Sequence, residues 1–215
     1  MEYIINIFRD FSEITATTWY VLSGIVVLSI IALAAKPKTK INVKALVYGG
    51  LFISISFILS YVKFYHWPQG GSITLASMLP MFIYAYIFGP RAGIAAGAAY
   101  GLLQLIQDPY ILHPMQVLLD YFIAFAALGL AGFVPGNLSL AILLGGFGRF
   151  FSSFLSGVIF FGSYAPEGMS PIIYSLAVNG SVIGTDTLLC FAVALLPQIR
   201  NVILQMKTQA ITNGY

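Results

Sequence analysis

Long apolar stretches separated by short polar connections dominate the pattern of residues along the chain. A helix needs about 20 mostly apolar residues to cross the hydrocarbon core of a bilayer. Seven stretches meet or approach this length: residues 15–35, 41–62, 72–88, 92–106, 114–133, 138–162 and 172–200. The third and fourth are short and rich in Gly and Ala, so we expect them to pack against neighbouring helices. The pattern predicts an all-α integral membrane protein.

Basic residues indicate how these helices are oriented. Lys36, Lys38, Lys40 and Lys44 lie between the first two stretches, and the positive-inside rule places such a segment in the cytoplasm. Seven alternating crossings then put the N-terminus outside and the C-terminus inside a plasma membrane. The first stretch follows acidic residues rather than a basic n-region, so we interpret it as a retained helix and not as a cleaved signal peptide.

Composition excludes several other classes of protein. The 215 residues are 59% hydrophobic and only 8% charged, whereas soluble domains are about 25% charged. This excludes a soluble enzyme domain, a nucleic-acid binder and a disordered segment. The single cysteine, Cys190, excludes a disulfide framework and a Cys-based zinc site. No P-loop, nucleophile elbow or His-Glu-x-x-His pattern occurs, so we expect no catalysis, metal or cofactor in this chain.

Three ionisable residues fall inside predicted helices: Asp120, Arg149 and Asp186. A charged side chain costs at least about 2.5–3.5 kcal/mol at the centre of a membrane helix, so such residues face a cavity or a partner. Gln116 lies four residues before Asp120 and therefore shares its helix face. This pair either contacts a ligand or ties two helices together. Asp186 pairs with Arg149 or marks an ion path, and the sequence does not decide between these.

Polar and aromatic residues gather near the outer ends of the predicted helices. They come from the loop around Trp67 and Ser72, from the loop after Phe160, and from Tyr174 and Asn179. Aromatic faces with one carboxylate suit a flat cationic ligand, through stacking, cation–π attraction and a counter-ion. An aromatic belt at the membrane interface is the alternative. His66, His113 and Asp108 are a weaker candidate for a metal site, because they lie in separate loops.

Small residues recur at a spacing of four along two of the predicted helices. Gly93, Gly97 and Gly101 form one series, and Gly50 with Ser54 forms another beside the pair Ala45 and Gly49. Such spacing lets helices approach closely. We interpret the three-glycine series as internal packing.

Four motifs follow one another along the chain: PQGGSIT (68–74), YILHPMQVLLDY (110–121), SGVIFFGSYAPEG (156–168) and YSLAVN (174–179). Together, in this order, they resemble the thiamine-specific S component of the energy-coupling factor (ECF) vitamin transporters. The resemblance implies a six-helix, S-component-like vitamin-binding bundle over residues 41–215. Residues 1–40 would then add one extra N-terminal transmembrane helix and a basic cytoplasmic linker. The resemblance also implies that the chain binds thiamine with nanomolar affinity. It further implies docking on a shared module of one scaffold membrane protein and two ATPase subunits, as in an ABC transporter.

The resemblance further assigns roles to single residues. Asp120 would hydrogen-bond the aminopyrimidine or balance the thiazolium, Phe161 and Tyr174 would stack on the rings, and Asn179 would bond the pyrimidine edge. Gly50 and Ser54 match the docking motif. The complete expected ligand site is Trp67, Ser72, Tyr110, His113, Gln116, Asp120, Tyr121, Ser153, Gly157, Phe161, Tyr174 and Asn179. The chain departs from the family at Ser153, Leu75, Val178 and Val182, where members carry histidine, a carboxylate or tyrosine.

Three alternatives remain open at this point. The chain is an S component for a related vitamin or a thiamine precursor, a stand-alone ion-coupled carrier, or an intramembrane enzyme. The carrier would use Asp120 and Asp186 as proton or sodium relays. The enzyme would use His113 and Asp108, although no catalytic constellation surrounds them.

Overall fold

The computed structural model describes residues 43–67 and 70–212. Several expectations lie outside the described residues. They are the helix over residues 15–35, the N-terminal unit 1–40, the location of the N-terminus, and residues 68–69 of the first motif.

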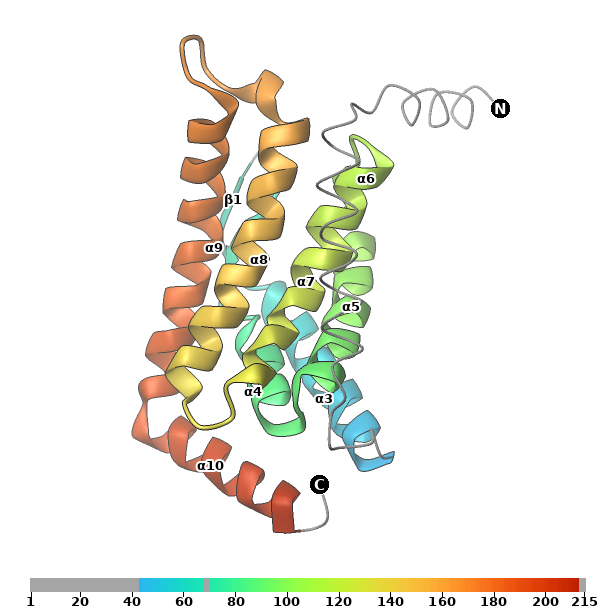
Figure 1. The fold of residues 1–215 in the computed structure, drawn as a ribbon, viewed down its shortest axis with the longest axis vertical. Helices are drawn as coiled ribbons and strands as arrows, with labels where there is room; N and C mark the ends of the chain where they lie inside the picture. The colour runs from blue at the N-terminus through green and yellow to red at the C-terminus, as the bar shows by residue number, and fades with distance from the viewer. Residues whose placement is uncertain (1–42, 68–69, 213–215) are drawn as a thin grey trace, which may run out of the picture.

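Within that part of the chain, six membrane-embedded helices form a bundle (Figure 1). They are α3 (Val43–Ser60), α4 (Leu79–Phe88), α5 (Pro90–Gln107), a composite helix over Pro114–Phe133, α8 (Leu138–Phe160) and α9 (Pro171–Leu195). The composite helix consists of α6 (Pro114–Val117), the π-helical η1 (Leu118–Ile123), α7 (Ala124–Ala126) and the 3-10 helix η2 (Ala127–Phe133). All except α4 and α5 are long and apolar enough to cross a membrane on their own. The predicted all-α membrane fold is confirmed.

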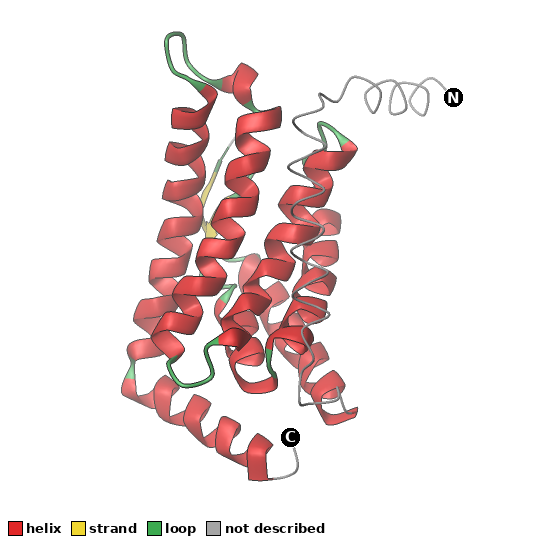
Figure 2. Cartoon of the chain, in the orientation of Figure 1, coloured by secondary structure: helices red, strands yellow, loops and turns green. Residues whose placement is uncertain are grey.

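The prediction of one helix over residues 72–88 is wrong. Ser72–Thr74 forms strand β2, which pairs antiparallel with β1 (Lys63–His66) (Figure 2). Gly70 and Gly71 in the connecting turn have φ values of +88° and +86°, which glycine adopts without steric penalty. Helix α4 starts only at Leu79, with Pro80 in its first turn, where the missing N–H of proline breaks no helical bond.

Helices α4 and α5 pack inside the bundle, as expected from their composition. Every residue of α4 is buried. The three glycines at positions 93, 97 and 101 bring α5 against the composite helix: a Cβ added at Gly93 would lie 2.9 Å from Gly129 Cα, and one at Gly101 would lie 2.9 Å from the carbonyl carbon of Tyr121. These distances are too short for any side chain, so the glycine series serves internal packing.

The last predicted stretch, residues 172–200, is two helices rather than one. Helix α9 ends at Leu195, and α10 (Pro197–Thr212) runs across the end of the bundle (Figure 1). Leu196 has an extended ψ of 127°, because a residue that precedes proline is disfavoured in the helical region. Ile203 and Ala210 of α10 are buried, and Lys207 donates to the carbonyl of Pro135.

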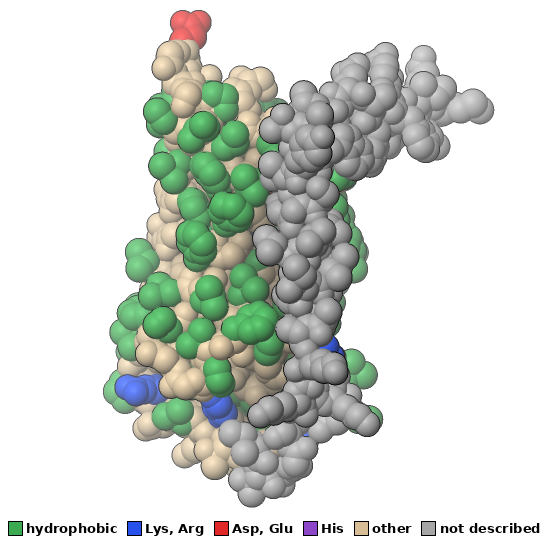
Figure 3. Space-filling view, in the orientation of Figure 1, with side chains coloured by type: hydrophobic (Ala, Val, Ile, Leu, Met, Phe, Trp, Pro, Cys, Tyr) green, Lys and Arg blue, Asp and Glu red, His purple; other side chains and the backbone are tan. Residues whose placement is uncertain are grey.

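The outward surface of the bundle is apolar. Hydrophobic side chains cover the visible face of α8 and α9, cationic side chains gather near α10, and an acidic side chain lies at the opposite end (Figure 3). Leu46 and Phe147 are among the large apolar residues that remain more than half exposed. A bundle surrounded by lipid requires such a surface.

Candidate functional site

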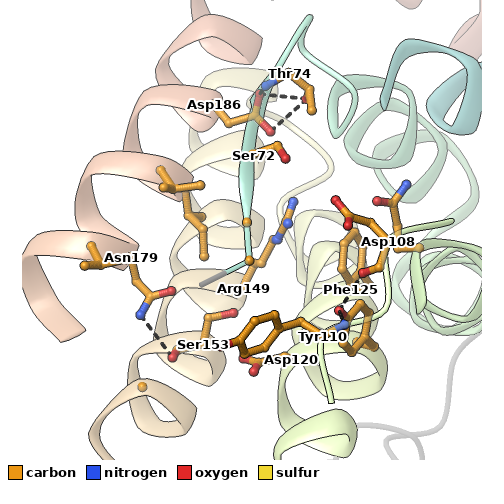
Figure 4. A pocket seen from close by; sticks show the side chains of 18 of the residues that line it. Ser72, Thr74, Asp108, Tyr110, Asp120, Phe125, Arg149, Ser153, Asn179 and Asp186 are labelled. Carbon is orange, nitrogen blue, oxygen red and sulfur yellow. Dashed lines mark hydrogen bonds between the residues drawn. The ribbon is translucent and has the colours of Figure 1, made fainter. Parts of the chain in front are cut away.

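A cavity opens between the hairpin, α5, the composite helix, α8 and α9 (Figure 4). Its empty volume is about 1090 Å³, including the open mouth. Ten of the twelve residues predicted for the ligand site line it, and those on the helices come from three different elements. Its walls combine charged, hydroxyl and amide side chains with several aromatic and aliphatic ones, and a concave site with convergent polar groups is typical of small-molecule binding.

Asp120 lies on the π-helical segment η1, where the widened turn interrupts the regular helix. Turns of this kind are frequent at functional sites. The Oδ2 atom of Asp120 accepts hydrogen bonds from Gln116 Nε2 and from Ser156 Oγ, each at 2.8 Å. Gln116 is buried and is itself held by the backbone N–H of Leu112, which donates to its Oε1 at 3.1 Å. Both bonds to the carboxylate end on one oxygen, so Oδ1 retains lone pairs for a ligand.

Three aromatic rings form a mouth cluster, which we define as Tyr110, Phe161 and Tyr164. The rings of Tyr110 and Phe161 stack with centroids 5.7 Å apart, and the hydroxyl of Tyr110 donates to that of Tyr164 at 3.0 Å. This hydrogen bond raises the pKa of Tyr110 to about 12. Tyr121 fixes the loop from below, accepting from the N–H of Tyr110 and donating to the carbonyl of Asp108.

Helices α8 and α9 form the next part of the cavity wall, and α8 contacts Asp120 through Ser156. Asn179 Nδ2 donates to the carbonyls of Ser153 and Ser175, both at 3.2 Å, so its Oδ1 is left to accept from a ligand. A Cβ added at Gly157 would lie 3.0 Å from Asn179 Nδ2, so this glycine allows the two helices to approach. Tyr174 completes the outer part of the wall, and Val178 and Val182 give it an apolar surface.

The inner end of the cavity holds Arg149 and Asp186, but it does not pair them. Asp186 accepts hydrogen bonds from Thr74, at 3.1 Å and 3.2 Å from its hydroxyl and at 3.4 Å from its N–H. The guanidinium of Arg149 lies over the ring of Phe125, 4.2 Å from the centroid. Ion pairs within 4 Å are recorded for neither residue in the described parts of the chain.

Two residues predicted for the ligand site lie elsewhere. His113 caps α6, accepting from the N–H of Met115 at 3.1 Å, and its ring stacks on Phe160. Trp67 packs edge-on against Tyr65 beside the hairpin turn. Asp108 instead pairs with Lys63 at 2.6 Å and approaches His66 at 3.6 Å. Over residues 43–67 and 70–212, no three His, Cys, Asp or Glu side chains come together as a metal site would require.

The sequence interpretation missed several uncharged lining residues, among them Ser60, Ser77, Tyr100 and Gln104. They come from α3, α5 and the bend before α4, and only the tertiary fold brings them together. Gln104 Nε2 donates to Ser60 Oγ at 2.9 Å, and the hydroxyl of Tyr100 donates to the carbonyl of Ser56. In the sequence, only the helical spacing of small polar residues could have indicated that these residues line a cavity. Such spacing is common in membrane helices, so it does not identify a site.

The two small-residue pairs on α3 face in different directions. Ala45 is completely buried, and a Cβ on Gly49 would lie 3.1 Å from the hydroxyl oxygen of Tyr84. No atom lies within 4 Å of a Cβ built at Gly50, and Ser54 is exposed with its hydroxyl donating to the carbonyl of Gly50. The pair Gly50 and Ser54 therefore forms an open notch on the outside of the described bundle.

Comparisons with known proteins agree with this architecture. The family model described as thiamine transporter protein (Thia_YuaJ) matches residues 46–206. Thiamine transporter ThiT of Bacillus subtilis is 34% identical over 140 residues, which cover 57% of this chain and 72% of that protein. Thiamine transporter ThiT of Lacticaseibacillus paracasei is 32% identical over 136 residues, 54% of this chain and 68% of that protein. A solved structure of ThiT from Listeria monocytogenes shares the fold, with a TM-score of 0.64 at 24% identity over 76% of this chain and 93% of that chain. The chain thus belongs to the thiamine transporter protein family, whose members are multi-pass membrane transporters and not enzymes.

Proposed function

We propose that this chain is the thiamine-binding subunit of an ECF-type ABC uptake transporter. It captures the vitamin from outside with nanomolar affinity and delivers it together with a scaffold membrane protein and two ATPase subunits. The observation that carries the proposal is the pair of acceptor oxygens, Asp120 Oδ1 and Asn179 Oδ1, which line one cavity close to the mouth cluster. Acceptor oxygens suit the amino-bearing edge of an aminopyrimidine.

The charges of the cavity also favour a cationic vitamin. Three carboxylates and two cations line it: Asp108, Asp120, Asp186, Lys63 and Arg149. The formal excess of one negative charge complements the single positive charge of a thiazolium. Nanomolar binding requires about −12 kcal/mol. Ring stacking, one charge-assisted hydrogen bond and several neutral ones in an enclosed site are of the right order to supply it.

The same proposal places the mouth cluster on the extracytoplasmic side and α10 in the cytoplasm. Arg91, Arg200 and Lys207 then lie inside with the basic segment before α3, as the positive-inside rule requires. The acidic residues Asp108 and Glu167 then lie outside, and Asp108 lines the cavity.

Calorimetric titration of the purified full chain with thiamine tests the binding function. We expect saturable binding of one thiamine per chain in the nanomolar range. Titration with the separate pyrimidine and thiazole halves of the vitamin serves as the comparison, since a precursor-specific subunit would prefer one half to the whole. Thiamine that fails to bind at micromolar concentration overturns the proposal.

The notch on α3 provides a second prediction, for the partner module. Replacing Gly50 with leucine fills the notch, because no atom lies within 4 Å of a Cβ there. Close helix approach in membranes depends on small residues, so we expect ATP-dependent thiamine uptake by the reconstituted complex to fall at least about tenfold. Thiamine affinity of the isolated chain should stay within about twofold.

Gly184→Leu on α9 is the matched control, because that position is equally open and lies on a different helix. It should leave uptake unchanged. If the Gly50 and Gly184 variants take up thiamine equally well, the notch is not part of the docking surface. Uptake that needs an ion gradient but no ATPase subunits would favour a stand-alone carrier instead.

A further inference from the structure

A second cavity lies where α10 passes the ends of α3 and α4, at the end of the bundle opposite the mouth cluster (Figure 1). It is a groove with an empty volume of about 290 Å³. The described residues that line it are Lys44, Tyr48, Ile87, Phe88, Met206, Gln209 and Ala210. The walls are mostly apolar, and the rings of Tyr48 and Phe88 lie with their centroids 5.5 Å apart. The polar groups of the groove are therefore one ammonium, one amide and one phenol.

Lys44 alone is charged among the described residues that line this groove. Its side chain is exposed, and it forms no hydrogen bond or ion pair with any residue that the structure describes. Lys207 on α10 is instead held within the bundle, because it donates to the carbonyl of Pro135 and lies 3.6 Å from the ring centroid of Tyr86. The ammonium of Lys44 is thus available to a molecule from outside the described chain.

The α10 end of the described bundle is basic. Four cations lie there: Lys44, Arg91, Arg200 and Lys207. The acidic residues of the described chain lie elsewhere, three in the lining of the vitamin cavity and Glu167 in the loop before α9. Figure 3 shows the same separation, with cationic side chains near α10 and an acidic one at the opposite end. A surface of this charge attracts anions.

The surface beside Lys44 favours a lipid over a free anion. Val43, Leu46 and Val47 of α3 are 79%, 71% and 67% exposed, and α3 is long and apolar enough to cross a membrane. A lysine at the end of such a helix lies where headgroups meet hydrocarbon. An anionic phospholipid offers a phosphate to Lys44 and acyl chains to the apolar side chains next to it. The chain before α3 is a poorer occupant, because it carries three further lysines.

We infer that the groove between α3, α4 and α10 binds the headgroup of an anionic phospholipid. The ammonium of Lys44 pairs with the phosphate, and the amide of Gln209 and the phenol of Tyr48 border the same space. Basic pockets between membrane helices bind anionic headgroups in this way. A lipid held there contacts both α3 and α10, so its binding stabilises the packing of α10 across the end of the bundle.

The groove is separate from the notch proposed for the partner module. Lys44 lies six residues before Gly50, which places the two about 120° apart around α3. A lipid in the groove therefore leaves Gly50 and Ser54 open. The inference goes beyond the proposed vitamin binding and does not depend on it.

Lipid titrations of the purified full chain in an uncharged detergent test the inference. The two probes are phosphatidylglycerol and phosphatidylcholine with identical acyl chains, of which only the first has a net negative charge. Native mass spectrometry counts the bound lipids and gives their dissociation constants. We expect one saturable phosphatidylglycerol site, with an affinity at least about fivefold higher than that for phosphatidylcholine, the scale of one lysine beside an anionic lipid.

Lys44→Met should bring the two affinities to within about twofold of each other, because it removes the charge from the groove. Its melting temperature without lipid should equal that of the parent, since the Lys44 side chain is exposed. Arg200→Met is the matched control, because it removes an exposed cation from the same end of the bundle. Arg200 lies nine residues before Gln209 on α10, about 14 Å away and beyond the Debye length of about 8 Å at 0.15 M salt. This variant should keep the preference.

Three results would overturn the inference. Equal affinities of the parent for the two lipids would exclude an anion-selective site. An equal loss of preference in both variants would indicate diffuse attraction to a basic surface and no site in the groove. Displacement of phosphatidylglycerol by millimolar inorganic phosphate would show that the groove takes a free anion and not a lipid. A chain that prefers phosphatidylglycerol but binds no thiamine would refute the proposed function alone.

Discussion

Replacing Asp120 with alanine is expected to weaken thiamine binding by about 10- to 150-fold. The carboxylate is held by Gln116 and Ser156 through Oδ2, so it is fixed at the cavity wall before any ligand arrives. A hydrogen bond to a charged group contributes about 1.5–3 kcal/mol, which corresponds to this range of dissociation constants. Calorimetric titration of the purified variant measures the effect directly.

Two further variants separate the ligand contact from a general loss of structure. Asp120→Asn keeps one acceptor oxygen for its neighbours, replaces the other oxygen with an NH2 donor and removes the charge, so it should melt close to the parent while binding thiamine more weakly. Glu167→Gln removes an exposed carboxylate from the loop before α9, outside the cavity lining, and should bind like the parent. Parent-like affinity of Asp120→Ala would exclude this carboxylate from the site.

The parts of the fold that follow from local sequence were predictable. The boundaries of α3, α5 and α8 lie within a few residues of the apolar stretches, because a membrane helix must be both long and apolar. Gln116 and Asp120 were recognisable as a pair because four residues in a helix make one face. The role of the glycines at positions 93, 97 and 101 was likewise visible from their spacing.

Features that depend on distant contacts were not predictable. Strand β2 continues into the apolar residues of α4 without a break in the pattern, and its pairing with β1 and contact with α9 depend on the tertiary fold. The π-helical turn at Asp120 has no signature in residue type. Tyr100 and Gln104 line the cavity because α5 packs closely against the composite helix. The pattern of residues along the chain does not predict how close these two helices lie. His113 looked like a ligand contact, but its position before Pro114 made it a helix cap.

Gly101 connects this packing to the site, and replacing it with alanine is expected to lower both stability and affinity. A Cβ there would lie 2.9 Å from the carbonyl carbon of Tyr121 and 3.0 Å from Phe125 Cβ, and the carbonyl oxygen of Tyr121 is closer still. Backbone cannot yield as a flexible side chain does, so α5 must move away from η1. Overpacking of this kind costs about 1–3 kcal/mol. The displaced turn carries Asp120, so we expect at least about fivefold weaker thiamine binding although Gly101 itself does not line the cavity.

Gly184→Ala is the matched control for this prediction. Gly184 is also a glycine within a long helix, but no atom lies within 4 Å of a Cβ built there. Alanine has the higher helix propensity, so this variant should melt at or above the parent temperature and bind thiamine normally. Thermal melting of the purified chains and calorimetric titration compare the two. If Gly101→Ala matched Gly184→Ala in both measurements, the close approach of α5 to η1 would not be needed. If it melted lower but bound thiamine normally, the position of Asp120 would be maintained by Gln116 and Ser156 without support from α5.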